Sequence, residues 1–443
     1  MSDSPLPPTI LVIIGITGDL STRKLLPAIE KIVDSGAAPR ELKVIGITRR
    51  EVLAEEVLSS VDGKIDFLRN NLEMYQMDLT SPEGYLKLKS DLEATRSSMG
   101  ASTQTLFYLS IPPQISHSII TMLGEAGIAD LPGTKLLLEK PFGVDLESAT
   151  ELVDHVRSHF TEDQVYRIDH YLAKEMTQNL VVFRESNSLI KRTWNKDFIE
   201  SIEIVASESI GIEGRAEFYE QTGALRDLIQ SHLLQLAALV LADFPTIEWP
   251  SIPEQRLLAL RQLKAPQDVE ADVVRSQYIG YREEVGNPVS FVETFVSVRL
   301  FSDDTRWRGV PIRLTSGKAM PEKTTEIRIN YRKDRAEEAN SLVLHIQPDE
   351  GVVLDIWAKQ PGYERKLQKF PLSFSYQGHF DELPEAYERV FLDAMKSDHT
   401  LFTRSEEVLE TWRIIDPIQK YWAMNDVISE YAKGRAPELP NDL

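Results

Sequence analysis

The chain has 443 residues, of which 69 are acidic and 49 basic, giving a net charge of −20, and it contains no cysteine. This length exceeds one ordinary hydrophobic core, so we expect two large domains. The absence of cysteine excludes disulfides, thiolate metal sites and cysteine nucleophiles, and it fits the reducing cytoplasm. The negative charge disfavours a nucleic-acid surface, and no run approaches the ~20 apolar residues that span a membrane.

The first third of the chain alternates between strand and helix patterns. Residues 9–15 form a continuous apolar run, typical of a strand buried on both faces, and residues 25–33 follow with helical spacing. The pattern repeats with strands at 42–48, 105–109, 135–139 and 164–168 and a helix at 116–125. This alternation predicts a parallel, Rossmann-like sheet built from βαβ units, in a nucleotide-binding domain of residues 1–175.

The pattern changes near residue 175. Residues 199–207 alternate between apolar and polar, which suits an antiparallel strand with one solvated face. An apolar-rich helix is predicted for residues 223–242 and a helical tail for residues 384–432. Alternating segments lie between them, at 292–300, 310–315, 325–331 and 341–347. We therefore expect residues 176–443 to form a larger α+β domain with a big, mostly antiparallel sheet and helices, and a substrate site between the two domains.

A glycine turn follows the first strand. Gly15 and Gly18 stand where a buried strand gives way to a helix, and glycines there let the backbone approach a dinucleotide pyrophosphate. Leu20 replaces the third glycine of the usual fingerprint, so the turn alone is equally compatible with an ordinary strand-to-helix connection. The second strand ends in Arg49 and Arg50. An arginine there suits the 2′-phosphate of NADP, whereas NAD-binding folds usually have an acidic residue.

Two histidines are candidates for chemistry. His170 stands at the carboxyl end of a predicted strand, flanked by Asp169, Tyr171 and Lys174, a combination suited to holding a phosphate or a sugar. His232 lies on the apolar helix. An imidazole there is either a core residue with structural hydrogen bonds or a general base, and its neighbours alone favour the structural interpretation. No cluster of ligands indicates a metal site.

Several segments, in order along the chain, resemble the glucose-6-phosphate dehydrogenase family. RIDHYLAKE at 167–175 is similar to the family signature RIDHYLGKE, and GITGDLSTRKLLPA at 15–28 to its glycine-rich turn. YLSIPP, EKPFG, GIEGR, GALRDLIQSHLLQ and SGKAM also match. The resemblance implies an NADP-dependent enzyme, with NAD as a secondary cofactor, that oxidises glucose 6-phosphate to 6-phosphoglucono-1,5-lactone in the first step of the oxidative pentose phosphate pathway. It also implies a homodimer or homotetramer that uses one face of the antiparallel sheet.

The resemblance implies roles residue by residue. His232 is the base that removes the proton of the C1 hydroxyl, and Asp169 pairs with it and orients it. The residues implied to contact the sugar phosphate are Lys24, Lys140, His170, Tyr171, Lys174, Glu208, Asp227, Lys318, Lys323 and Gln347. Those implied to contact the cofactor are Gly15, Thr17, Gly18, Asp19, Leu20, Arg49, Lys140 and Pro141, with a cis peptide at Pro141. No metal is required.

The sequence departs from the family pattern at a few places. Ala173 replaces the glycine of RIDHYLGKE, which matters if that position needs a positive φ or close approach of the substrate. Ile16 and Ser21 replace small residues of the glycine turn, and Lys323 stands where an arginine is common. The main alternative is another sugar or inositol dehydrogenase with a nucleotide-binding domain and an antiparallel sheet. A further alternative is a non-catalytic homologue that serves as a scaffold or regulator.

Overall fold

A computed structural model describes residues 5–333, 339–377, 379–380 and 383–439 of the chain. The chain divides into two compact units, which we describe separately. The first comprises Met1–Gly143, Glu147–Ala173 and Pro384–Ser405, and the second Val144–Leu146, Lys174–Leu383 and Glu406–Leu443. The sequence-based division after residue 175 does not include the return of the late segment 384–405 to the first unit.

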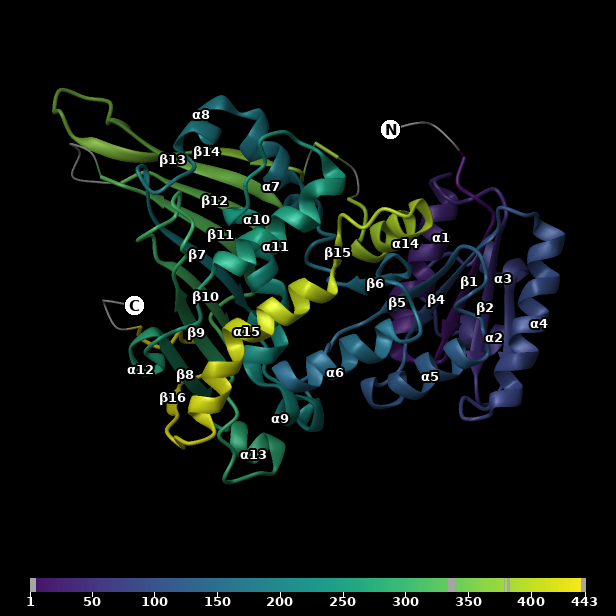
Figure 1. Ribbon diagram of the computed structural model, residues 1–443. Helices are drawn as coiled ribbons and strands as arrows, with labels where there is room; N and C mark the ends of the chain where they lie inside the picture. The colour runs from purple at the N-terminus through teal and green to yellow at the C-terminus, as the bar shows by residue number, and fades with distance from the viewer. Residues whose placement is uncertain (1–4, 334–338, 378, 381–382, 440–443) are drawn as a thin grey trace. The chain divides into compact units, whose positions relative to one another are not determined.

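The first unit is built on a seven-stranded sheet with the order β15-β6-β5-β4-β1-β2-β3 (Figure 1). Strands β1 to β6 are parallel, and only β15 runs antiparallel, beside β6. Their bounds are β1 (Thr9–Ile14), β2 (Leu42–Thr48), β3 (Leu72–Gln76), β4 (Gln104–Leu109), β5 (Thr134–Leu138), β6 (Val165–Ile168) and β15 (Phe402–Thr403). The order 3-2-1-4-5-6 is that of dinucleotide-binding sheets, so the predicted parallel, Rossmann-like domain is confirmed.

Helices connect these strands. They are the π-helix η1 (Ser21–Leu25), α1 (Leu26–Asp34), α2 (Ala54–Leu58), α3 (Asp66–Asn71), α4 (Pro82–Met99), α5 (Pro113–Glu125), α6 (Leu146–Arg157), the 3-10 helix η2 (Glu162–Gln164) and α14 (Ala386–Lys396). Every residue of β1, β4 and β5 is buried, because helices cover both faces of a parallel sheet. This burial is why the strands read as unbroken apolar runs in the sequence.

Helix α14 joins the first unit through buried polar contacts. The Lys135 ammonium donates to Gln104 Oε1 at 2.7 Å and to Ser397 Oγ at 2.8 Å. The Gln104 amide donates in turn to the carbonyl of Met395 at 2.9 Å. Gln104 is the first residue of β4 and Lys135 the second of β5, so the late segment completes the first core rather than the second.

The second unit is built on a nine-stranded sheet with the order β14-β13-β12-β11-β7-β10-β9-β8-β16 (Figure 1). Its pairs are antiparallel except β7 with β10 and β8 with β16, which confirms the predicted, mostly antiparallel sheet. The strands are β7 (Ile199–Ser207), β8 (Val273–Tyr278), β9 (Phe295–Leu300), β10 (Ile312–Gly317), β11 (Thr324–Tyr331), β12 (Ser341–Gln347), β13 (Gly351–Lys359), β14 (Leu367–Ser375) and β16 (Ser429–Tyr431).

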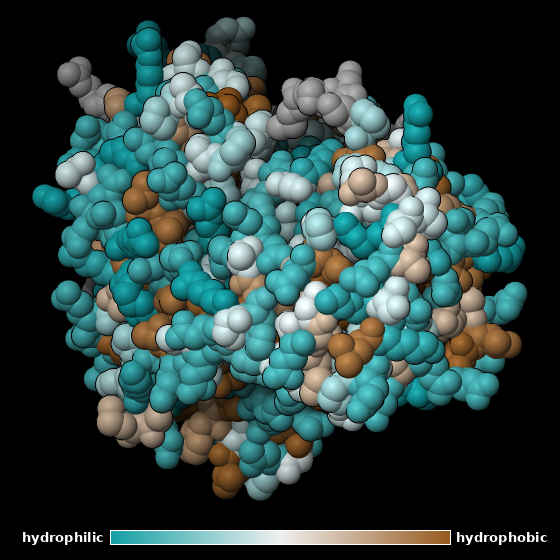
Figure 2. Space-filling view, turned by 45° about the vertical axis from the view of Figure 1, so that its right-hand side comes forward, coloured by the Kyte–Doolittle hydropathy of each residue, from teal (hydrophilic) through white to brown (hydrophobic). Residues whose placement is uncertain are grey.

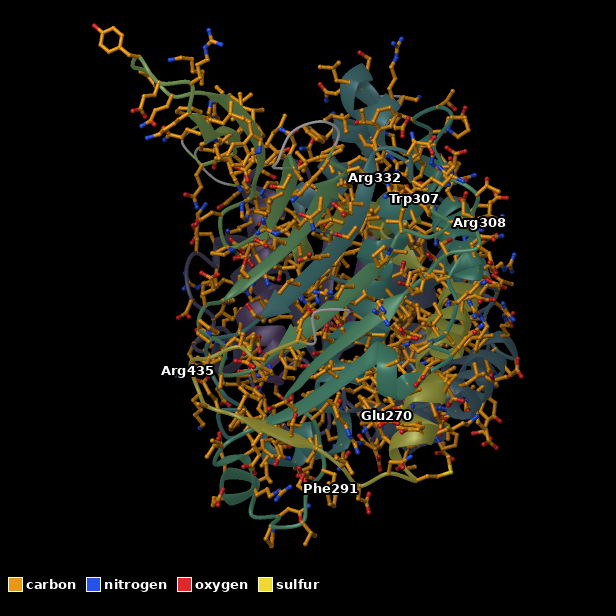
Figure 3. All side chains as sticks on the ribbon, turned by 90° about the vertical axis from the view of Figure 1, so that its left-hand side faces the viewer. Glu270, Phe291, Trp307, Arg308, Arg332 and Arg435 are labelled. Atoms are coloured by element: carbon orange, nitrogen blue, oxygen red, sulfur yellow. The ribbon has the colours of Figure 1, made fainter. Side chains whose placement is uncertain are left out.

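Helices of the second unit gather on one face of its sheet, and Figure 3 looks onto the other face. They are α7 (Glu175–Ser186), α8 (Ser188–Thr193), α9 (Ala216–Ala224), the π-helix η3 (Leu225–Leu233), α10 (Leu234–Leu241), the 3-10 helix η4 (Trp249–Ser251), α11 (Ile252–Gln262), α12 (Val269–Asp272), α13 (Tyr281–Val285) and α15 (Ser405–Trp422). The predicted helix at 223–242 is thus three segments, and the predicted helical tail also contains β15 and β16.

The surface is mostly hydrophilic on the face shown in Figure 2, where apolar side chains are scattered among polar ones. One helical stretch among the described residues, Ala216–Leu241, has the length and mean hydropathy to cross a membrane. Its most apolar window is 83% buried inside the fold, as in the core helix of a globular protein.

Candidate active site

The glycine turn of the first unit is fixed by close packing. Gly15 has φ = 90°, and a Cβ on it would lie 2.2 Å from the carbonyl oxygen of Ser110, so only glycine fits. The Gly18 N–H donates to the Gly15 carbonyl at 2.9 Å and closes the turn. Ile16 is buried over Gly46 of β2, where a Cβ would lie 2.7 Å from the Ile16 side chain. The bulky residue at Ile16 is therefore accommodated by a glycine on the neighbouring strand.

Ser21, the second departure in this turn, has hydrogen-bonding partners on both sides. Its hydroxyl lies 2.9 Å from Ser110 Oγ and donates to the Gly15 carbonyl at 3.1 Å. These bonds tie the first turn of η1 to the ends of β1 and β4. The sheet order reverses between β1 and β4, and nucleotides bind at such a switch point.

A crevice of about 540 Å³ opens at this switch point, and we call it the arginine crevice. Its lining includes Gly15, Thr17, Gly18, Arg49 and Arg50. Both arginines are exposed, and no acidic residue is among the described residues that line the crevice. The missing side chains of the glycine turn leave room for a pyrophosphate, and the guanidinium groups suit a further phosphate. The crevice therefore fits a nicotinamide dinucleotide.

A second crevice in the same unit, of about 450 Å³, is called here the histidine crevice. Its lining brings together Gly18, Asp19, Leu20, Lys140 and His170, five of the residues predicted to bind cofactor or substrate. The Lys140–Pro141 peptide is cis, as predicted. Ser110, Ile111 and Pro112 line both crevices, so the two spaces adjoin along the ends of β1 and β4.

Glu139 and Tyr387 also line the histidine crevice, and the sequence interpretation missed both. The phenol of Tyr108 donates to Glu139 in a very short hydrogen bond. Burial raises the pKa of the Glu139 carboxyl, although the phenols of Tyr108 and Tyr387 and the charge of Lys140 partly offset that effect. Glu139 precedes Lys140 in the EKPFG segment, which is the one signal that could have indicated it. Tyr387 arrives on α14 from far along the chain, and no local pattern marks it.

The signature segment places Asp169 and His170 at the carboxyl end of β6. Asp169 is 3% exposed and accepts a hydrogen bond from the Tyr171 N–H at 3.0 Å, which fixes the turn that follows the strand. The His170 ring packs edge-on against Tyr171 with 4.9 Å between ring centroids. Ala173 is buried, and it is not among the described non-glycine residues with positive φ. Replacing glycine by Ala173 therefore costs no backbone strain.

Lys24 has a different environment from the other predicted residues of the first unit. It is exposed on η1 and forms an ion pair with Glu385 at 3.2 Å. It is absent from the lining of both crevices.

In the second unit, the structure brings Glu208, Asp227 and Lys318 together. Glu208 and Lys318 directly follow β7 and β10, whose parallel register pairs Ser207 with Gly317. The Lys318 ammonium forms a very short contact with the Glu208 carboxylate and lies 3.8 Å from Asp227 Oδ2. Lys318 is only 4% exposed, so these carboxylates offset the cost of burying its charge. A carboxylate pair beside a lysine can hold sugar hydroxyls.

His232 lies on η3, the same π-helix that carries Asp227. It is 1% exposed. π-helical turns are rare and frequently occur at functional sites. Glu293, from the chain before β9, accepts a hydrogen bond from the Leu225 N–H at 2.8 Å and so fixes the first residue of this helix. Nothing in the local sequence marked Glu293 as a partner of the histidine helix.

The remaining predicted residues of the second unit lie at the start of α7 and near β12. Lys174 is the N-cap residue of α7, and the Met176 N–H donates to Glu350 Oε2 at 2.6 Å. Burial raises the pKa of Glu350, and the charge of Lys174 partly offsets this effect. The Gln347 side chain at the end of β12 donates to Thr325 Oγ1 at 3.0 Å. Lys323 is exposed just before β11.

The fold and the site define an oxidoreductase that joins a dinucleotide-binding sheet to a large antiparallel sheet. Residues 12–179 match the family model for the glucose-6-phosphate dehydrogenase NAD binding domain, and residues 181–441 match the model for its C-terminal domain. The chain belongs to the glucose-6-phosphate dehydrogenase family, which removes the alternative of another sugar or inositol dehydrogenase family.

Individual relatives support this assignment over nearly the whole length. Glucose-6-phosphate 1-dehydrogenase of Chlamydia muridarum is 36% identical, covering 97% of this chain and 93% of its own. The enzyme of the same name from Bacillus subtilis is 35% identical, covering 100% and 98%. A solved structure of glucose-6-phosphate dehydrogenase in complex with its substrate glucose-6-phosphate matches with a TM-score of 0.91 and 31% identity, covering 99% and 97%.

Proposed function

We propose that this chain oxidises D-glucose 6-phosphate at C1 to 6-phosphoglucono-1,5-lactone, with NADP as the hydride acceptor. One observation carries the proposal: in each unit, residues predicted to act in catalysis or to bind substrate follow the carboxyl ends of strands. These are Asp169 and His170 after β6, and Glu208 and Lys318 after the parallel pair β7 and β10. Family membership and the substrate complex of the structural relative support the same substrate for this chain.

His232 is the proposed base. An imidazole with an ordinary pKa of about 6.5 removes a hydroxyl proton effectively near neutral pH. Asp169 is the carboxylate proposed to orient that ring and to stabilise its protonated form. Both side chains are buried, which excludes water from competing for the proton. When bound, NADP supplies the acceptor for the hydride that leaves C1.

The cofactor preference rests on the arginine crevice. Arg49 and Arg50 line it beside Gly15 and Gly18, and its described lining contains no acidic residue. A carboxylate there would hold the ribose hydroxyls of NAD and repel a 2′-phosphate, whereas guanidinium groups bind that phosphate in charge-assisted hydrogen bonds. We therefore propose NADP as the preferred cofactor and NAD as a secondary one.

Initial-rate assays with two sugars and two cofactors test this proposal. Glucose 6-phosphate should exceed glucose in kcat/KM by at least ~100-fold, because glucose lacks the charge-assisted phosphate contacts. NADP should exceed NAD by at least ~10-fold for the same reason at the 2′-position. Equal kcat/KM for glucose and glucose 6-phosphate would contradict the substrate, and equal values for NADP and NAD would contradict the cofactor preference.

We also propose that the enzyme is a cytoplasmic homodimer or homotetramer, joined through the helix-free face of the nine-stranded sheet (Figure 3). This face presents polar side chains in register, with Arg328 donating to Glu326 at 2.8 Å and Lys369 to Asp355 at 2.8 Å. Sedimentation velocity of Arg328→Glu against the unchanged chain tests the interface, and unchanged assembly would contradict it.

A further inference from the structure

The turn that follows β10 has a strained backbone directly after Lys318. Ala319 adopts φ = 50°, a left-handed conformation that residues with a Cβ rarely adopt. Three backbone N–H groups of the turn are engaged: Lys318 N–H with Thr294, Ala319 N–H with Ile210 and Met320 N–H with Glu208, at 2.8, 2.8 and 2.9 Å. Such a conformation persists only where the surroundings fix it from several sides.

The short strand β16 supplies the other side of this turn. The phenol of Tyr431 donates to the Lys318 carbonyl at 2.6 Å, and the Gly434 N–H donates to the Ala319 carbonyl at 2.7 Å. Both carbonyls of the strained turn are therefore bound by the segment 431–434. Parallel pairing with β8 holds that segment, with Tyr431 opposite Tyr278.

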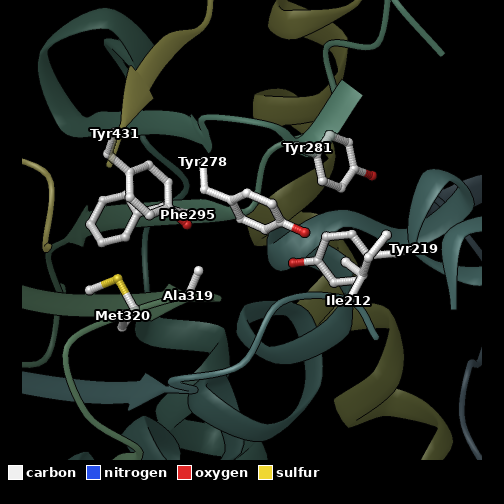
Figure 4. Close-up of a cluster of buried hydrophobic side chains, with 8 residues drawn as sticks. All are labelled: Ile212, Tyr219, Tyr278, Tyr281, Phe295, Ala319, Met320 and Tyr431. Atoms are coloured by element: carbon white, nitrogen blue, oxygen red, sulfur yellow. The ribbon is translucent and has the colours of Figure 1, made fainter. Parts of the chain in front are cut away.

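A second hydrogen bond orients the Tyr431 phenol. The Thr294 hydroxyl accepts from the Tyr278 N–H at 2.8 Å, so its own proton can go to the Tyr431 oxygen, 2.9 Å away. The Tyr431 proton is then left for a carbonyl, and the Lys318 carbonyl at 2.6 Å is closer than the Thr294 carbonyl at 3.2 Å. Tyr431 is 5% exposed and packs with Tyr278 and Phe295 in a cluster of buried side chains (Figure 4). Burial in this cluster excludes water as a substitute partner for the phenol.

The Lys318 ammonium lies near two carboxylates and an aromatic ring. Its ammonium contacts Glu208, lies 3.8 Å from Asp227 and stands 5.5 Å from the centre of the Tyr219 ring. Glu208 is tied to the same turn, because its N–H donates to the Gly317 carbonyl at 2.9 Å. A shift of the turn backbone therefore moves the ammonium and the Glu208 carboxylate together.

We propose that Tyr431 is a positioning residue for Lys318: strand β16 clamps the strained turn at Lys318 and Ala319 and thereby fixes the ammonium that binds substrate. This inference rests on the proposed role of Lys318 in holding the sugar phosphate. In this proposal, Tyr431 itself touches neither substrate nor cofactor. It acts through the backbone carbonyl of Lys318.

Tyr431→Phe removes the phenol and keeps the ring. Loss of one buried hydrogen bond to the turn should raise the KM for glucose 6-phosphate about fivefold, while kcat and the KM for NADP stay within about twofold. The control is Tyr278→Phe, which deletes another phenol of the same cluster that bonds instead to Glu284 at 2.8 Å. It should leave the KM for glucose 6-phosphate unchanged, although both variants lower the melting temperature.

Ala319→Gly provides a rescue in the Tyr431→Phe background. Glycine adopts positive φ without strain, so the turn no longer depends on the clamp. The double variant should lower the KM for glucose 6-phosphate most of the way back to the value of the unchanged chain. A purely structural role of Tyr431 predicts no such recovery.

Hydrogen–deuterium exchange of the peptide spanning 317–322 reports on the clamp without any substrate. Tyr431→Phe should raise its exchange rate at least about threefold, and Tyr278→Phe should not. Unchanged exchange in Tyr431→Phe, equal changes in both variants, or faster exchange with unchanged KM in an active enzyme would each overturn the proposal. If the unaltered chain fails to oxidise glucose 6-phosphate, the proposed function falls, and the exchange rates still decide whether the clamp exists.

Discussion

The Glu293 carboxylate occupies the space that a side chain at Gly223 would fill. Gly223 has φ = 64°, and a Cβ on it would lie 2.4 Å from Glu293 Oε1. The same oxygen accepts the Leu225 N–H at 2.8 Å, and the Glu293 carbonyl accepts the Ala224 N–H at 3.0 Å. The Glu293 carboxylate therefore fixes the start of the helix that carries Asp227 and His232, and it has room to do so because residue 223 is a glycine.

Gly223→Ala should lower the free energy of unfolding by about 3 kcal/mol, because it adds backbone strain and a clash with a buried acceptor. It should also lower kcat, since the helix bearing His232 must shift. Gly286→Ala is the matched control, with φ = 68° and open space around the position. Its cost should be about 1 kcal/mol, with kcat unchanged. Urea unfolding and steady-state kinetics measure the two effects. Equal losses of unfolding free energy in the two variants would show that the Glu293 carboxylate moves aside without cost.

His232→Asn should reduce kcat by a factor of about 100 to 10,000, the usual contribution of a general base. Binding of glucose 6-phosphate, measured by equilibrium titration, should change less than threefold, about 0.6 kcal/mol, because the ring is replaced by a smaller polar group. His379→Asn, at an exposed histidine, serves as the control and should retain full turnover. Normal turnover in His232→Asn would exclude it as the base.

Arg49→Ala should weaken NADP binding about 10- to 100-fold by removing a charge-assisted contact with the 2′-phosphate. NAD binding should change by less than about twofold, because NAD lacks that phosphate. Arg40→Ala removes an exposed arginine that does not line the arginine crevice and should affect neither cofactor. Equal losses for NADP and NAD would assign Arg49 a general electrostatic role instead.

Lys135 makes stability depend on pH in the alkaline range. Burial lowers the pKa of its ammonium to about 8, from 10.5 in the unfolded chain. The unfolded state thus holds more protons between these values, so stability rises with pH there. From pH 7.5 to 9.5 the contribution of Lys135 to the free energy of unfolding should increase by about 2 kcal/mol.

Urea unfolding of Lys135→Met at the same two pH values isolates that contribution. The variant should lack the alkaline gain, even though it is less stable overall because the carbonyl of Ala394 and the Ser397 hydroxyl lose their donor. An identical rise in both proteins would mean that other groups cause it.

Much of the fold could be predicted because its signal is local. The strand at 42–48 was predicted with its observed bounds, since burial on both faces forces an unbroken apolar run. Strands β13 and β14 were missed because their side chains are mostly half-buried or exposed and give no clear alternation. β16 has only three residues and exists by pairing with β8, a contact that no local pattern encodes.

Some features of the candidate site could also be predicted from local sequence, and others could not. Gly15, Arg49 and Asp169 were predictable because each follows a strand whose carboxyl end faces the ligand side of a parallel sheet. That Glu208 and Lys318 form an ion pair depends on the parallel register of β7 and β10, which their sequences do not specify. Glu293 and Tyr431 act through backbone groups of distant residues, so their roles emerge only from the packed structure.

The return of residues 384–405 to the first sheet has a consequence for synthesis on the ribosome. A nascent chain that ends at residue 175 has made β1 to β6 but not α14, so the Lys135 ammonium lacks the acceptors at Ala394 and Ser397. The dinucleotide-binding sheet therefore stays incompletely covered by helices while more than two hundred further residues are translated. An expression fragment cut at residue 175 would inherit the same open edge, and a circular permutant that begins at α14 would remove the delay.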